Sequence, residues 1–390
     1  MFPTMQPSAL SPLNPRMGRD QVTIYDSTLR DGEQMPNLAF TLDQKVTIAR
    51  MLDEVGLPQI EVGFPAVSEG EFRSIREIAS LGLDADTLAL TRLLRKDIDI
   101  TVESGVDMAL LFIATSDLHM RYKLRKGEGE IIDQAVDAVE YCRERGIKVS
   151  FSAEDSTRTD LDFLLRLFKA VEEAGVDRLG LTDTVGCACP EAIQTLVSTV
   201  KSEVSTPLSL HLHNDYGLAL PNAIAGIKSG ADAITTTVNG IGERSGNVAL
   251  EQLVSCLEFI YHVDTGIDTT RLYELCEMVS AYGNHPLPKN HPLVGENAFA
   301  HESGIHVAAV LNCPLTYESI PPEWVGNRRR LHMGKHSGIT YIRRRMEELG
   351  FSPEEEHVCE VLLRVKRRAE EGGQVTDEEF RSIVADVLER

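Results

Sequence analysis

The feature that most constrains the fold is an eightfold alternation of short apolar runs with helical patterns. Each run is rich in β-branched or apolar residues, and the spacing that follows it is typical of an amphipathic helix. The predicted strands are 22–25, 59–63, 87–90, 108–114, 148–152, 178–181, 207–211 and 233–238. Eight such units within about 245 residues predict an α/β fold of the (β/α)₈ TIM-barrel class. A doubly wound open sheet is the alternative, but no Gly-rich phosphate loop follows the first run.

Local signals mark the ends of several predicted helices. Thr41 and Gln44 form a capping-box pattern, which predicts a helix that begins there and ends at Gly56. Pro190 suits the first turn of the helix after the sixth run, because its missing N–H would have no partner there.

Beyond Asp264 the strand–helix rhythm stops, and Pro and His become frequent. Helical patterns return near residues 339–349 and 354–371. We therefore predict a flexible N-terminal arm over 1–20, a catalytic barrel over 21–263, and a mostly helical C-terminal region over 264–390.

Charge and cysteine content exclude several classes of protein. The net charge of −21 argues against nucleic acid or an anionic membrane as the main partner, because both require a basic surface. No run of about 18 apolar residues predicts a membrane span. Seven irregularly spaced cysteines form no disulfide framework, which favours the reducing cytoplasm.

Polar residues collect where the predicted strands end, which is the catalytic face of such barrels. His211 and His213 are two apart on a strand, so both side chains point to one side and can bind one metal ion. Asp31 is the predicted carboxylate ligand, and Asn247 offers a weaker oxygen. The alternative is that the histidines only make hydrogen bonds at a polar barrel mouth.

Other polar residues at this face allow two readings each. Arg30 either forms a surface salt bridge or donates to a developing oxyanion. Glu154, in the segment that begins at Ser152, is either a solvated carboxylate or a catalytic group. Thr184 either caps a strand or binds a substrate carboxylate.

Five segments resemble the DRE-TIM metallolyase superfamily, in its Claisen-condensing branch of homocitrate and 2-isopropylmalate synthases. They are Asp26–Gln34, His211–Ala219, Asn239–Asn247, Ala300–His306 and Gly334–Gly338. The resemblance covers about residues 22–340, and the order of the segments matches the family.

The resemblance implies specific roles. Asp31, His211 and His213 would bind a divalent metal ion (Mg, Mn or Zn), with Asn247 as a possible fourth ligand. Arg30 would stabilise the enolate or alkoxide. Gln34 would line the same pocket, and Glu154, His306 and Tyr317 would transfer protons. Apart from the resemblance, we predict Ser152, Thr184 and Arg92 as further substrate-binding residues. His306 and Tyr317 often come from the second subunit in this family, which implies a homodimer.

The implied reaction condenses acetyl-CoA with a 2-oxo acid and then hydrolyses the thioester, as in homocitrate synthase. The metal would polarise the keto group, and a positioned base would deprotonate the acetyl methyl. The basic stretches Arg328–Arg330 and Arg121–Lys126 are candidate contacts for CoA, although each is as consistent with a solvated surface.

The acceptor stays open at this stage. Alternatives are a 2-isopropylmalate or citramalate synthase, or a synthase of the phosphonomethylmalate type in which Arg92 or Arg95 binds the extra anion. Ser150 stands where lysine-pathway homocitrate synthases have an Arg. A lyase of the superfamily is disfavoured because Asn239–Asn247 lacks cysteine. A biotin-dependent carboxyltransferase and a non-catalytic metal-binding relative are further alternatives.

Overall fold

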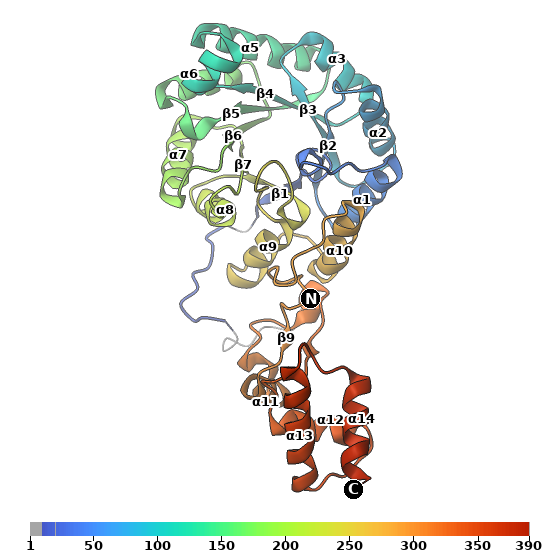
Figure 1. Ribbon diagram of the computed structural model, residues 1–390. Coiled ribbons are helices and arrows are strands. Elements are labelled where there is room, and N and C mark those ends of the chain that lie inside the picture. Colours follow the sequence, from blue (N-terminus) through green and yellow to red (C-terminus); the bar gives the residue numbers. More distant parts are fainter. Residues whose placement is uncertain (1–9, 20, 390) are drawn as a thin grey trace. The chain divides into compact units, whose positions relative to one another are not determined.

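The computed structural model describes residues 10–19 and 21–389, and its first compact unit, Pro15–Leu287, contains the barrel. Eight parallel strands close into one sheet because β1 pairs with both β2 and β8 (Figure 1). The strands are β1 Thr23–Asp26, β2 Gln59–Gly63, β3 Asp86–Arg92, β4 Met108–Ala114, β5 Lys148–Glu154, β6 Arg178–Asp183, β7 Leu208–Leu212 and β8 Ala233–Thr236. The predicted TIM-barrel fold is confirmed.

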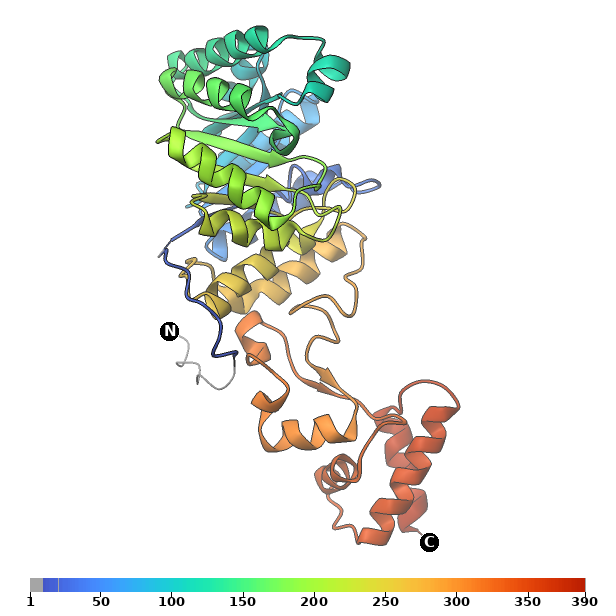
Figure 2. The same ribbon diagram turned by 90° about the vertical axis from the view of Figure 1, so that its left-hand side faces the viewer.

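Helices cover the outside of the barrel (Figure 2). Apolar residues of these helices, such as Ile48, Ile75 and Phe168, are buried. The helices are α1 Leu42–Glu54, α2 Glu69–Ala79, α3 Arg95–Ser104, α5 Glu128–Glu144, α6 Leu161–Glu173, α7 Pro190–Glu203, α8 Ala219–Lys228, α9 Leu250–Ser255 and α10 Leu272–Tyr282. The capping box predicted at Thr41 and Gln44 is present, and Pro190 is the first residue of α7.

Two regions of the chain depart from the predicted helices. Before α5, the chain forms α4 (Asp117–His119) and then a π-helix, η2 (Met120–Leu124). The helix predicted after the eighth strand is divided into α9 and a second π-helix, η5 (Cys256–Ile260). π-Helical turns are frequent at functional sites, and η2 places Lys123 at the barrel mouth.

The barrel unit ends later than the boundary expected after residue 263. Helix α10 packs against α1, so the compact unit continues to Leu287. At the other end, Met17 is buried and its N–H donates to Tyr261 O at 3.2 Å. Arg19 forms an ion pair with Asp232 at 2.7 Å. The described end of the expected arm is therefore attached to the barrel, whereas residues 1–9 and 20 lie outside the described residues.

The second unit begins at Pro288 and is mostly helical. Its elements are β9 Ala300–His301, α11 Gly304–Asn312, β10 Arg330–Leu331, α12 Ile339–Glu348, α13 Glu355–Glu370 and α14 Asp377–Leu388. Helices α12 to α14 share one apolar core that includes Ile342, Val361 and Phe380. Within the described residues, no helix is both long and apolar enough to cross a membrane.

A buried ion triad connects the loop after β1 to the loop after β2. Lys45 Nζ on α1 lies 2.5 Å from Glu33 Oε2 and 2.6 Å from Glu71 Oε2, and the Lys45 side chain is only 3% exposed. Glu71 Oε1 also accepts from the N–H of Phe64, which lines the barrel mouth. The triad therefore holds in place two loops that shape the mouth.

We expect Lys45→Met to destabilise the fold by about 3 kcal/mol, because it leaves two carboxylates facing each other without a cation. Urea unfolding followed by circular dichroism measures the change. The control is Arg73→Met on α2, which removes an exposed i,i+4 pair with Glu69 and should have a much smaller effect. Equal losses in the two variants would show that the triad has no special role.

Candidate metal and substrate site

A cavity of about 520 Å³ opens at the carboxyl ends of the strands. All eight strands, or the loops that follow them, contribute side chains to its lining. They are Tyr25, Arg30, Asp31, Gln34, Glu61, Phe64, Leu90, Leu110, Phe112, Lys123, Ser152, Glu154, Thr182, Thr184, His211, His213, Glu243 and Arg244. This is the face at which TIM-barrel enzymes place their active sites.

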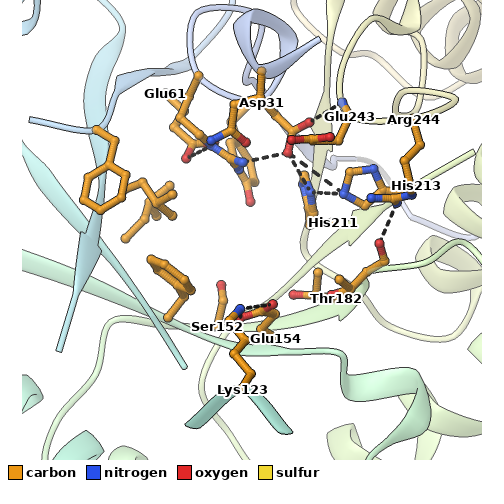
Figure 3. Close-up of a pocket in the computed structure, with 18 residues that line it drawn as sticks. Asp31, Glu61, Lys123, Ser152, Glu154, Thr182, His211, His213, Glu243 and Arg244 are labelled. Carbon is orange, nitrogen blue, oxygen red and sulfur yellow. Dashed lines mark hydrogen bonds and ion pairs between the residues drawn. The ribbon is translucent and has the colours of Figure 1, made fainter. Parts of the chain in front are cut away.

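The predicted Asp–His–His set lies together on one side of the cavity (Figure 3). His211 Nε2 and His213 Nε2 are 3.2 Å apart, and they lie 3.4 and 4.0 Å from Asp31 Oδ2. All three groups offer a ligand atom within 4.8 Å of the others. Two imidazole nitrogens and one carboxylate oxygen with open positions are a donor set that suits a divalent transition metal or Mg²⁺.

The protonation states also fit a cation. His213 Nδ1 lies 3.3 Å from Gly246 O, a contact in which Nδ1–H donates and Nε2 keeps its lone pair. Burial, with help from neighbouring His211, lowers the pKa of His213 to about 4, so this ring is neutral at pH 7. Although burial opposes its ionisation, the Arg30 guanidinium holds the pKa of Asp31 well below its usual range.

Asn247, the predicted weaker ligand, lies beside Asp31. Its Nδ2 donates to Asp31 Oδ1 at 2.9 Å and to Ile241 O at 3.1 Å. Its Oδ1 is buried and has no hydrogen-bond partner among the described residues, which is the state expected of an oxygen that binds an ion. Position 242 in this loop has room only for glycine, because a Cβ there would lie 2.7 Å from Asp31 Oδ1 and 2.3 Å from Asn247 Nδ2.

Arg30 is held rigidly by Glu61, a residue that the sequence did not single out. Arg30 Nε lies 2.6 Å from Glu61 Oε1, and Nη2 lies 3.0 Å from Oε2. The remaining Nη1 donates to Asp31 Oδ2 at 2.6 Å. Glu61 is fully buried and also accepts from Ser27 Oγ at 2.5 Å. This carboxylate fixes the fork of Arg30 beside the predicted metal ligands.

Three of the predicted substrate-binding residues, Gln34, Ser152 and Thr184, line the cavity. Glu154, the predicted proton-transfer residue of the barrel, lines it as well. Glu154 accepts from Lys123 Nζ at 2.6 and 2.8 Å. Thr182, which sequence reasoning missed, adds a further hydroxyl-bearing residue from β6.

The structure does not bring Arg92 into this lining. Its Nε lies 2.5 Å from Asp97 Oδ2, and its side chain is half exposed. Arg95, the other suggested anion contact, pairs with Asp137 at 2.5 Å on the surface.

His306 and Tyr317 belong to the second unit. Their rings are stacked with centroids 3.9 Å apart, and both side chains are exposed. Helix α11 carries His306, and the 3₁₀ turn Pro314–Thr316 brings Tyr317 back against it. The two residues thus form one exposed, stacked pair in the second unit.

A buried carboxyl beside the site predicts a pH dependence of stability. Asp26 ends β1, and one oxygen accepts from Thr28 N–H at 2.8 Å, whereas the other has no partner in the described chain. Burial raises the pKa of Asp26 to about 7. In the unfolded chain it ionises near 3.9, so between about pH 4 and 7 the folded state binds more protons. Stability should therefore fall as the pH rises through this window.

Asp26→Asn removes this titration and keeps the carbonyl oxygen that accepts from Thr28. The unfolding free energy of the variant, relative to the natural protein, should rise by up to about 4 kcal/mol between pH 4 and 8. Urea titrations at a series of pH values measure the difference. A difference that does not change with pH would show that Asp26 is ionised in the folded state.

Comparisons with protein families identify two matching regions. The HMGL-like family model matches residues 21–279, and the model described as homocitrate synthase post-HMGL domain-like matches residues 293–373. The first match covers the strands that carry the cavity, and the second covers the His306–Tyr317 pair.

Curated relatives match over nearly the whole chain. Homocitrate synthase AksA of Methanocaldococcus jannaschii is 49% identical, over 98% of this chain and 95% of its own. The 2-isopropylmalate synthase of the same organism is 47% identical, over 95% of this chain and 72% of its own. A putative (R)-citramalate synthase CimA of Methanopyrus kandleri is 45% identical, over 95% and 73%.

Solved structures confirm the fold. The HMG-CoA lyase of Bacillus subtilis superposes with a TM-score of 0.64 at 22% identity, over 70% of this chain and 97% of the lyase. At this identity the likeness concerns the barrel alone. The three synthases in the sequence comparison carry different names at nearly equal identity, so overall similarity does not choose among their acceptors.

Proposed function

Because this chain belongs to the HMGL-like family, we propose that it condenses acetyl-CoA with a 2-oxo acid and releases CoA, as a homocitrate synthase-like acyltransferase. The observation that carries the proposal is the Asp31–His211–His213 cluster, with the Arg30 guanidinium fixed against it by Glu61. The acetyl group becomes an alkyl substituent of the product, a 2-hydroxy acid with one more carboxylate than the acceptor.

The cluster would hold a divalent cation, with Asn247 Oδ1 as an additional oxygen ligand. A cation bound there supplies Lewis-acid polarisation of the acceptor's keto group. Hydroxyl-bearing residues on β5 and β6 lie across the same cavity and would orient the acceptor's carboxylate: Ser152, Thr182 and Thr184.

Arg30 and the proton-transfer groups complete the proposed chemistry. A base deprotonates the acetyl methyl, and the resulting carbanion attacks the keto carbon, whose oxygen becomes an alkoxide. Arg30 donates to this developing negative charge from a fixed position, which costs no reorganisation at the moment of reaction. Glu154, His306 and Tyr317 are the proposed groups that move the protons. Water then hydrolyses the thioester and drives the sequence forward.

The likeness to this family also supports our proposals on substrates, assembly and location. The substrates are small molecules, and a homodimer in the cytoplasm is the assembly and location that we propose. Lyase chemistry on a branched acyl-CoA is the second candidate, since a lyase shares the barrel. It is disfavoured because no cysteine occurs among the described side chains that line the cavity.

The test is thiol release from acetyl-CoA with Mg²⁺, Mn²⁺ or Zn²⁺ and a panel of 2-oxo acids. The panel contains pyruvate, 2-oxoisovalerate, 2-oxoglutarate, oxaloacetate and phosphonopyruvate. We expect release that requires both the metal and one of the acceptors. Release that is independent of the acceptor would indicate a thioesterase and would refute the proposal.

A further inference from the structure

The proposed condensation does not specify the group that the 2-oxo acid carries beside its keto carbon, and we infer that this group is apolar and uncharged. The inference rests on the condensation proposed above. It comes from the part of the cavity wall that lies away from the predicted metal ligands, and from the partners of every cation that lines the cavity.

Side chains of β3 and β4, with Phe64 directly after β2, form an apolar wall of the cavity. Leu90 on β3 and Leu110 on β4 are register partners, so their side chains lie side by side. Phe112, two residues along β4, meets the ring of Phe64 edge to face at a centroid distance of 6.5 Å. Tyr25 also lines the cavity and packs with Leu90 and Leu110 in the barrel interior.

This wall faces the metal ligands. In a closed barrel of eight strands, β3 and β4 lie across from β7 and β8, and β7 carries His211. Figure 3 shows His211 and His213 on one side of the cavity, with Ser152 and Glu154 on another. An acceptor held by its keto and carboxylate oxygens at the metal and the hydroxyls would direct its substituent to the remaining side, which is the apolar wall.

Each cation that lines the cavity already has a carboxylate partner. Arg30 binds Glu61 and Asp31, and Lys123 binds Glu154. The third cation is Arg244, whose Nε lies 2.8 Å from Asp215 Oδ1. The charge of each of the three is therefore already balanced by a protein carboxylate before an acceptor binds.

One further cation, Arg92, packs against Phe64 without lining the cavity. The Arg92 guanidinium carbon lies 5.6 Å from the centroid of the Phe64 ring. Its Nε is bound to the buried carboxylate of Asp97, and Arg92 does not line the cavity. Phe64 therefore presents its ring, and not a charge, to the substrate.

The net charge of the cavity lining also favours an acceptor with an uncharged substituent. Counted by residue type, four carboxylates and three cations line the described cavity, which gives one negative charge. A divalent cation changes this to one positive charge, which a single acceptor carboxylate neutralises. A second carboxylate would add an unbalanced negative charge and would lose its hydration against aliphatic and aromatic carbon.

The experiment compares matched acceptors with the full-length enzyme. We expect kcat/KM for 2-oxoisovalerate or 2-oxobutyrate to exceed that for 2-oxoglutarate and oxaloacetate by about 100-fold or more. In parallel, each acceptor is added with Mg²⁺ and without acetyl-CoA, and the shift in Tm is measured. Only the apolar acceptors should raise Tm, so acceptor binding is read independently of condensation.

Two outcomes separate the inference from the function. Preferred turnover of 2-oxoglutarate or oxaloacetate would overturn the apolar acceptor and leave the condensation intact. Tm shifts by apolar acceptors without any turnover would support the acceptor class and overturn acetyl-CoA as the donor. If neither Tm nor thiol release responds to an apolar acceptor, the inference fails.

A pair of variants tests the wall itself. Leu90→Lys places an ammonium group on it, whereas Leu90→Met keeps it apolar at nearly the same volume. The lysine variant should reduce the preference for 2-oxoisovalerate over 2-oxoglutarate by at least about tenfold, and the methionine variant should keep it. An unchanged preference in the lysine variant would show that the substituent lies elsewhere. Circular dichroism first establishes that both variants fold.

Discussion

Replacement of His211 by alanine should lower metal-dependent thiol release by at least about 1,000-fold, because the ion loses one of two imidazole ligands. Nε2 of this residue lies 3.2 Å from His213 Nε2 and 3.4 Å from Asp31 Oδ2, within the predicted ligand cluster. The amount of metal retained after dialysis, measured by mass spectrometry, should fall together with the rate.

The matched control is His285→Ala. His285 is exposed and lies beyond α10, so its loss should change neither the metal content nor the rate. A His211→Ala protein that keeps a full complement of metal and a rate within tenfold of the natural one would remove His211 from the metal site. It would also make the hydrogen-bonding reading of the two histidines the better one.

Arg30→Met should lower kcat by about 100- to 1,000-fold and leave the metal content nearly unchanged. The reason is that Arg30 is the one cation in the described cavity that bonds directly to a predicted metal ligand, and so stands closest to the forming alkoxide. Steady-state thiol release at saturating acceptor measures the loss.

The neighbouring Glu61 complicates this variant, and a double substitution separates the two effects. Without the guanidinium, Glu61 is a buried carboxylate that lacks its cation, which alone should destabilise the fold by about 3 kcal/mol. Arg30→Met combined with Glu61→Gln removes that charge and should recover most of the stability but none of the activity. Recovery of activity in the double variant would show that Arg30 acts only by balancing the charge of Glu61.

The sequence was sufficient for the fold because a barrel repeats one unit. Eight alternations of apolar run and amphipathic helix leave few other arrangements, and signals such as the Thr41 capping box act within a few residues. Helix α14 was missed, since its apolar positions are spread among charged ones and are buried in a core shared with α12 and α13. The two π-helices, η2 and η5, were not predicted either.

Some residues of the site were predictable from the sequence, and others were not. The spacing of His211 and His213 on one strand predicts a shared direction, and the structure places them together. Glu61 was missed because its partner, Arg30, lies on the neighbouring strand's loop, although a glutamate inside an apolar strand is itself a signal. Arg92 was expected to bind substrate, but Asp97, five residues later, binds it outside the cavity.

The most direct test of the central claim is the identity of the product formed from acetyl-CoA labelled with two ¹³C atoms in the acetyl group. The reaction contains the metal and 2-oxoisovalerate, 2-oxobutyrate or 2-oxoglutarate, and the acid products are analysed by mass spectrometry. The account predicts a 2-hydroxy acid heavier than the acceptor by one labelled acetic acid, with both ¹³C atoms in a new carboxymethyl group. Labelled acetate as the sole labelled product, with the acceptor unchanged, would contradict it.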